Sequence, residues 1–405
     1  MLTKRERILF ILLYLLPFID MINGFLIRKK GISGIGSAFH LLLLVTFLLI
    51  TYFKSKVTFG QFEKYALLLL TVFLISGLIN SIIINDFQPI SLERVEKIIT
   101  NTIIITAMYR LVNGKRITQG ELNKLLIYIC FVVSVVTLIA NFLHLGNYTY
   151  EISKLGMTGF FTGSNEPVAV FVILNAFLVF NFYEKQKLWY LIPFSCLEID
   201  LIYVQSKSSY MYALLFVVIL ICIQCQKILK RGRVNKYVLL LGIPGIFLVA
   251  FAGKNLFLNT ISNFINRQSF IKTAYGNTGF LNYISSGRIA RIENLVGSIF
   301  DRNFFIMCFQ VLFGQGLNFE YIEIIEIDVL DAFLYGGLLG ASIIMMYMIA
   351  ILNKINKSSK LILILTLLIY LYSFMAGHIW TGGISGIYLA LVLVYFMNEK
   401  WEENQ

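Results

Sequence analysis

The sequence predicts an all-α fold: a polytopic integral membrane protein with about 12 transmembrane helices and a large extracytoplasmic loop after the ninth. Hydrophobic residues fill 58% of the 405 positions and charged residues 14%, whereas ordinary soluble domains have about 25% charged residues. One membrane helix takes about 20 apolar residues, so this content supplies about a dozen spans. The composition therefore argues against a soluble multidomain protein, a disordered chain and a DNA-binding protein.

Apolar runs bounded by charged residues place each span in turn. The first run follows Lys4, Arg5 and Arg7, but it is too long for a signal peptide and lacks a small-x-small cleavage site, so we expect an uncleaved span. The fourth run is short, which fits a tilted or interfacial helix. The predicted spans are 8–27, 36–53, 65–84, 98–112, 124–145, 167–183, 188–204, 209–228, 236–252, 329–352, 360–378 and 380–397.

The chain reads as a single membrane domain over 1–405, with the segment 253–328 as its extracytoplasmic loop. Within this loop, apolar residues recur at helical spacing from Ile289 to Ile299, which predicts an amphipathic helix on the outer membrane face. The stretch 304–313 is too short to span and ends at Gly314 and Gly316. A re-entrant or interfacial piece is expected there.

Basic residues indicate the orientation, because cytoplasmic loops carry an excess of Lys and Arg. With the N-terminus inside, 21 of the 34 Lys and Arg are cytoplasmic, and six of the other 13 lie in the long segment. The short segments therefore split 21 to seven, with Arg28, Lys29 and Lys30 as the exception. We expect both termini in the cytoplasm, and we attribute the net charge of +12 to these loops, not to nucleic acid.

Cysteine and glycine patterns indicate no cofactor. Five cysteines are an odd number, and Cys222 and Cys225 form a lone Cys-x-x-Cys pair at the end of an apolar run. We interpret them as two thiols at lipid depth, with a metal or redox role as the less favoured alternative. Glycine shows neither a dinucleotide nor a P-loop pattern.

Polar residues inside the spans gather toward the outer ends, and no carboxylate falls in the inner half of a span. Such residues are costly in lipid, so their positions carry information. The asymmetry favours a cavity that opens outward over a conducting path, which needs polar contacts near the midplane. The alternative is that each residue only meets the headgroups. The set comprises Asp20, Asn23, His144, Glu198, Asp200, Asp328, Asp331 and His378.

Six short motifs, in a fixed order, carry a resemblance to a known family. They are GFFTGSNEP at 159–167, QSKSSYMYALL at 205–215, SSGR at 285–288, LFGQGL at 312–317, EIDVLDAFLYGGLLG at 326–340 and GHIWTGG at 377–383. In this order, on twelve spans with one long loop, the chain resembles the O-antigen and capsular polysaccharide repeat-unit polymerases (Wzy type), which are related to the O-antigen ligases.

The resemblance implies a glycosyltransferase in the bacterial cytoplasmic membrane. It would move a growing glycan from undecaprenyl diphosphate to a sugar hydroxyl of a new lipid-linked repeat, with inversion, on the outer face. A flippase and a chain-length regulator are the implied partners besides the lipid bilayer. Two departures are visible: Lys207 stands where the family often has Arg, and Glu326 stands where the ligases carry His-Asn.

This chemistry needs a cation for the leaving diphosphate. Because no Asp-x-Asp motif is present, we expect no metal and assign the role to Arg288 and Lys207, with Arg291 one helical turn further. Glu326, Asp328 and His378 are the candidate general bases. The remaining candidate substrate contacts are Asp331, Asn165, Glu166 and Trp380.

Each assignment has a structural alternative. Interfacial arginines attract anionic lipids, and Asp328 or Glu166 can cap a helix N-terminus. Interfacial Trp is common in membrane proteins without any sugar. Two other functions also remain open: a lipid-linked oligosaccharide flippase, and a ligase that moves finished glycan to another acceptor.

Overall fold

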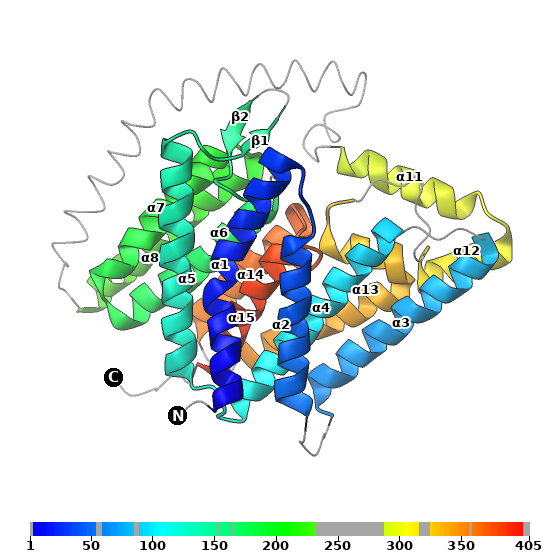
Figure 1. Cartoon of the computed structure of the whole chain (residues 1–405), viewed down its shortest axis with the longest axis horizontal. Helices are drawn as coiled ribbons and strands as arrows, with labels where there is room; N and C mark the ends of the chain where they lie inside the picture. Colours follow the sequence, from blue (N-terminus) through cyan, green and yellow to red (C-terminus); the bar gives the residue numbers. More distant parts are fainter. Residues whose placement is uncertain are drawn as a thin grey trace.

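The computed structural model describes residues 3–53, 59–84, 89–151, 154–163, 165–231, 287–315, 325–355 and 359–399. Over these residues the fold is helical, with 13 α-helices, one short 3-10 helix and one two-stranded hairpin. The predicted all-α class is therefore confirmed. Figure 1 shows the helices as one bundle.

The helices follow one another with short connections. The first group is α1 (Lys4–Lys30), α2 (Ile35–Tyr52), α3 (Gln61–Ile84), α4 (Pro89–Asn113) and α5 (Gln119–Phe142). The hairpin β1 (Tyr148–Tyr150) and β2 (Leu155–Met157) follows, and then come α6 (Asn165–Lys185), η1 (Leu188–Tyr190), α7 (Leu191–Val204) and α8 (Lys207–Arg231). The last group is α11 (Arg288–Phe300), α12 (Phe304–Phe313), α13 (Asp328–Ile355), α14 (Lys360–Met375) and α15 (Gly383–Asn398).

Every predicted span that the structure describes is helical. Among the described residues, seven helices are long and apolar enough to cross a membrane, namely α1, α2, α3, α5, α6, α8 and α13. Two predicted spans correspond to the shorter apolar helices α14 and α15, and two correspond to α4 and α7. The predicted span 236–252 and most of the loop 253–328 lie outside the described residues.

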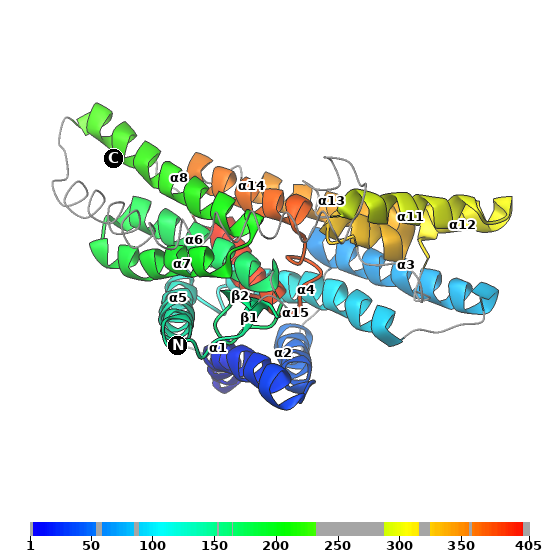
Figure 2. The same ribbon diagram turned by 90° about the horizontal axis from the view of Figure 1, so that it is seen from above.

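Two helices form the centre of the bundle. In α6 and α15 almost every side chain is buried, with Val168–Val172 and Ile387–Phe396 almost completely so. Helices that are apolar on all sides belong in the interior. Seen from above in Figure 2, α1 and α2 lie on one side of the molecule and α8, α14 and α13 on the other, with α6, α15 and α4 between them.

The start of α1 and the end of α15 lie at the same end of the bundle (Figure 1). Arg116, before α5, forms an ion pair with Glu6 in α1 at 2.9 Å, and Gln119 donates a hydrogen bond to Glu399 at 2.7 Å. The hairpin and α11 lie at the opposite end, where α11 runs across the bundle. Arg28, one of the three basic residues that oppose the predicted orientation, lies at the end of the bundle that carries the hairpin. It forms an ion pair there with Glu151.

The described residues 287–315 contain two helices, as expected. Leu295 and Ile299 of α11 are buried, whereas Phe300 is 63% exposed, which is the division of an amphipathic helix. α12 ends at Gly314, as predicted. It packs against α13, which is kinked at Gly337, where φ is +61° and ψ is −158°.

Candidate functional site

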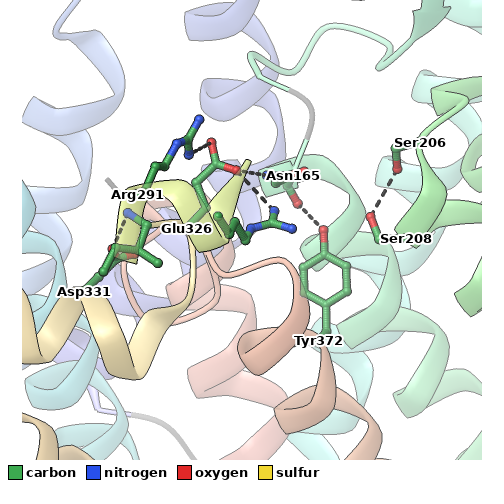
Figure 3. A network of polar contacts seen from close by, with 9 residues as sticks. Asn165, Ser206, Ser208, Arg291, Glu326, Asp331 and Tyr372 are labelled. Carbon is green, nitrogen blue, oxygen red and sulfur yellow. Dashed lines mark hydrogen bonds and ion pairs between the residues drawn. The ribbon is translucent and has the colours of Figure 1, made fainter. Parts of the chain in front are cut away.

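Several helix N-termini meet at the end of the bundle opposite the start of α1. Those of α6, α8, α11 and α13 bring together residues of four sequence motifs (Figure 3). Helix N-termini carry unpaired N–H groups and a partial positive charge. This end of the molecule is therefore electrostatically suited to an anion.

Glu326 lies at the centre of the site, between two guanidinium groups. Its Oε2 is 3.1 Å from the Arg288 Nη2, and its Oε1 is 3.4 Å from the Arg291 Nη1. The two arginines lie one turn apart on α11, so the predicted pairing on one face is observed. Their side chains are 14% and 20% exposed, and that of Glu326 is 31% exposed. The group is partly buried, yet solutes can reach it.

One donor of Arg288 stays unsatisfied within the described part of the chain: its Nε is buried and has no hydrogen-bond partner. A buried donor without a partner is costly. A guanidinium has five N–H donors. The hydrogen bond from Arg288 to Glu326 uses one of them, on Nη2. Arg291 is a second guanidinium beside the same carboxylate. The unsatisfied Nε indicates that Arg288 has capacity for one further hydrogen bond.

Asn165 and Tyr372 complete the group on the side of α6. The Asn165 Nδ2 donates to Glu326 Oε2 at 3.4 Å, and the Tyr372 hydroxyl donates to the Asn165 carbonyl at 2.8 Å. Beyond Tyr372, Ser206 and Ser208 lie at the start of α8 with their hydroxyls 3.2 Å apart. Lys207 is the first residue of that helix. The SKS motif thus lies at the same end of the bundle as the arginine pair.

Asp328 has a structural role. Its side chain is fully buried and accepts five hydrogen bonds, four from the loop between α14 and α15 and one from the Ser373 hydroxyl of α14. The donors are Ser373, Ile379, Trp380 and Thr381, the last through both its amide and its hydroxyl. A carboxylate enclosed in this way favours the structural alternative, in which Asp328 holds this loop, over the expected role as a base.

His378 lies on that same loop, at a half-buried position. A Cβ on Gly377 would be 2.6 Å from the carbonyl of Glu326, so only glycine allows this close approach. Gly377, His378 and Glu326 all have positive φ. The GHIWTGG loop is therefore packed directly against the turn that carries Glu326, which keeps His378 beside the site.

Three other predicted contacts have partners inside the protein. Trp380 is completely buried and packs against Tyr347 and Tyr370, so this structure leaves no face of its ring open to a sugar. Glu166 accepts the Ile384 amide at 2.8 Å and caps α15. Asp331 is fully buried and accepts the Ile325 amide at 3.1 Å, which holds the turn before α13.

Sequence reasoning missed two buried polar residues beside this site. His40 in α2 is within hydrogen-bond distance of Asp20, and Asn101 in α4 donates to the carbonyls of Trp380 and Gly382. A single His or Asn inside an apolar span is itself a signal of function or of helix pairing. Tyr372 was missed because tyrosines are frequent in this chain.

No group of three or more metal-ligating side chains occurs among the residues that the structure describes. No family model matches the chain, and no curated protein or solved structure matches it significantly. The fold and the site therefore define a class: a helical protein with membrane-spanning character, carrying a cationic, partly open site at one end of its bundle.

Proposed function

We propose that this chain is a membrane glycosyltransferase of the repeat-unit polymerase type. It would transfer a growing glycan from polyprenyl diphosphate to a sugar hydroxyl of a second lipid-linked repeat, at the outer face of the bacterial cytoplasmic membrane. The observation that carries the proposal is the Arg288–Arg291 pair on α11, partly open and with one buried guanidinium donor free.

The reaction divides into two electrostatic tasks. The acceptor oxygen forms a bond to the anomeric carbon while the bond from that carbon to the diphosphate oxygen breaks, and the diphosphate takes the electron pair. Cations that meet this developing charge lower the barrier. Arg288 and Arg291 supply two planar forks for the diphosphate oxygens. Glu326 holds both forks in position until the diphosphate arrives.

The position of the arginine pair also suits a lipid-linked substrate. α11 buries one apolar edge in the protein and leaves Val296 and Phe300 exposed on the other, with Phe304 and Phe305 exposed just beyond it. Such a helix lies in the headgroup region of a bilayer. A polyprenyl diphosphate presents its charge at that depth, so its phosphates would arrive at the level of the arginines.

The test is reconstitution of the purified protein in lipid nanodiscs with a lipid-linked repeat unit. Polymer ladders that form in excess EDTA, with inverted linkage by NMR, would support the proposal. Wild-type protein that leaves the repeats unlinked in every cation tested would refute it. Arg302→Ala is a matched control, because Arg302 is exposed beyond the end of α11.

One observation favours a lipid-linked oligosaccharide flippase as a second candidate. α13 is broken at Gly337, and broken helices are common at the substrate sites of transporters. The kink releases backbone carbonyls from the helix, and these carbonyls already accept other hydrogen bonds. The Ser76 hydroxyl donates to the Tyr335 carbonyl, and the Gln315 backbone amide donates to the Leu334 carbonyl. Movement of lipid-linked oligosaccharide across proteoliposomes without polymer formation would favour this candidate.

A further inference from the structure

A second polar centre lies beside the arginine site, inside the bundle. The His40 Nε2 is 2.9 Å from the Asp20 Oδ1, and the Tyr388 hydroxyl donates to the other oxygen of Asp20 at 3.0 Å. These side chains come from α2, α1 and α15. Asp20 and Tyr388 are completely buried, whereas the His40 side chain keeps 11% of its surface accessible. Of these three side chains, only the imidazole keeps accessible surface.

The hydrogen bond to Asp20 determines how the imidazole is oriented. With Nε2 donating its proton to the carboxylate, the other ring nitrogen, Nδ1, holds the lone pair. This edge of the ring faces the start of α15: a Cβ on Gly383 would lie 3.8 Å from Nδ1. An Asp–His pair of this kind fixes the tautomer of the base and stabilises the imidazolium that forms.

The surroundings of His40 are charged on several sides. Glu166 of α6 and Glu96 of α4 interact electrostatically with it, in addition to Asp20. Lys97 of α4 approaches the same turn, with its Cε 3.4 Å from a Cβ placed on Gly383. Tyr388 is the titratable neighbour on α15. Titration of His40 would therefore depend on three carboxylates, one ammonium group and one phenol.

The start of α6 connects this centre to the arginine site. Asn165 donates to Glu326, and the next residue, Glu166, lies 2.9 Å from a Cβ placed on Gly382. The two centres are therefore neighbours, joined through Asn165 and Glu166 at the start of α6. An inverting transfer needs a cation at the leaving group and a base at the attacking hydroxyl. The two centres supply one of each.

We propose that His40 is the general base that takes the proton from the acceptor sugar hydroxyl, with Asp20 and Tyr388 as its positioning residues. This inference rests on the proposed polymerase function. As the hydroxyl oxygen bonds to the anomeric carbon, its proton passes to the His40 Nδ1. The bond to the diphosphate breaks at the same time, and the diphosphate leaves with the electron pair. The imidazolium later releases its proton to water.

The experiment compares His40→Gln and Asp20→Asn with wild-type protein in the nanodisc polymerisation assay, over pH 5 to 9. For wild-type protein the rate should rise with pH as His40 loses its proton. His40→Gln should lower the maximal rate by about two orders of magnitude or more and remove this rise. In Asp20→Asn the rate should fall and its pH dependence should change, because a neutral amide no longer stabilises the imidazolium that forms.

A binding measurement, a control variant and a fallback variant make the test decisive. Binding of the lipid-linked repeat should be unchanged in His40→Gln, which separates a base from a binding residue. His144→Gln is the matched control, since His144 is exposed at the end of α5, and it should behave as wild type. If His40→Gln does not fold, Asp20→Asn carries the test, because asparagine can still accept from Nε2.

A wild-type rate and pH profile in both variants would overturn the role of His40 while leaving the polymerase function intact. A loss of rate with an unchanged pH profile would also overturn it, because that pattern indicates a structural role. Wild-type protein without polymerase activity would instead reject the proposed function itself.

Discussion

At the scale of single residues, Glu326 and Asp328 show how neighbouring carboxylates can have different roles. Glu326 is partly exposed and contacts two arginines, whereas Asp328 is enclosed by five donors from its own chain. A buried carboxylate that accepts this many hydrogen bonds stabilises the loop that donates them. The first residue belongs to the candidate site, and the second supports the loop packed against it.

Replacing Arg288 by Ala should lower the polymerisation rate by about two to three orders of magnitude, because one charge that meets the leaving diphosphate is lost. Arg288→Lys should recover only part of the rate, since an ammonium cannot fork across two oxygens. The reconstituted assay measures both. A normal polymer length distribution in Arg288→Ala would remove Arg288 from the site.

Asp328→Asn should lower the free energy of unfolding by about 2–5 kcal/mol, because an amide NH2 would face donors where a carboxylate accepted hydrogen bonds. Thermal unfolding of the purified variant in detergent measures the change. Asp301→Asn is the control, since Asp301 is exposed at the end of α11 and should change stability little. Equal stability of the two variants would contradict the role given to Asp328.

At the scale of elements, glycines set the contact between α12 and α13. A Cβ on Gly337 would be 2.4 Å from the Leu312 carbonyl, and a Cβ on Gly314 would be 2.6 Å from the Gly336 and Gly337 amides. The LFGQGL and GGLLG motifs are thus two halves of one close backbone contact. Their sequence pattern therefore reflects packing, whatever the substrate is.

Gly337→Ala should destabilise the protein by about 1–3 kcal/mol or more, since it adds a backbone clash to a left-handed conformation. Gly297→Ala, at a half-buried position of α11 with nothing within 4 Å of the added Cβ, should instead be neutral or slightly stabilising. Thermal unfolding of both variants tests the pair. A neutral Gly337→Ala would show that the kink in α13 is not required.

At the scale of the whole molecule, the positions of the helix ends allow the predicted orientation in the membrane to be tested. The start of α1 and the end of α15 share one end of the bundle, and the candidate site lies at the other. If the basic residues orient the chain as expected, the site faces the outside. A polymerase that uses flipped lipid-linked repeats requires this orientation.

Cysteine labelling on intact cells checks it, in a background without the five native cysteines. A cysteine in place of Glu293, exposed on α11, should react with a membrane-impermeant maleimide. A cysteine in place of Lys124, exposed near the start of α5, should react only after the cells are opened. The reverse pattern would rule out an external polymerase and favour a cytoplasmic-face activity.

The sequence by itself determined the helices. Runs of apolar residues long enough for a bilayer leave the backbone no alternative to internal hydrogen bonding, so helix positions can be predicted from where these runs lie along the chain. The pairing of Arg288 with Arg291 was also within reach, because the SSGR motif supplied Arg288 and helical spacing placed Arg291 on the same face. Their contact with Glu326 was not predicted. Charged residues confined to span ends could be located in the same way.

Only the tertiary structure decided which polar residue meets which partner. Helical periodicity gives the face of a helix but not the neighbour it packs against, so it could not distinguish the exposed Glu326 from the enclosed Asp328. Nor could it show that Trp380 lies among tyrosines of α13 and α14. The pairing of Asp20 with His40 and Tyr388 joins residues from three helices up to 368 positions apart. Such contacts depend on how whole helices pack, which no local pattern in the sequence contains.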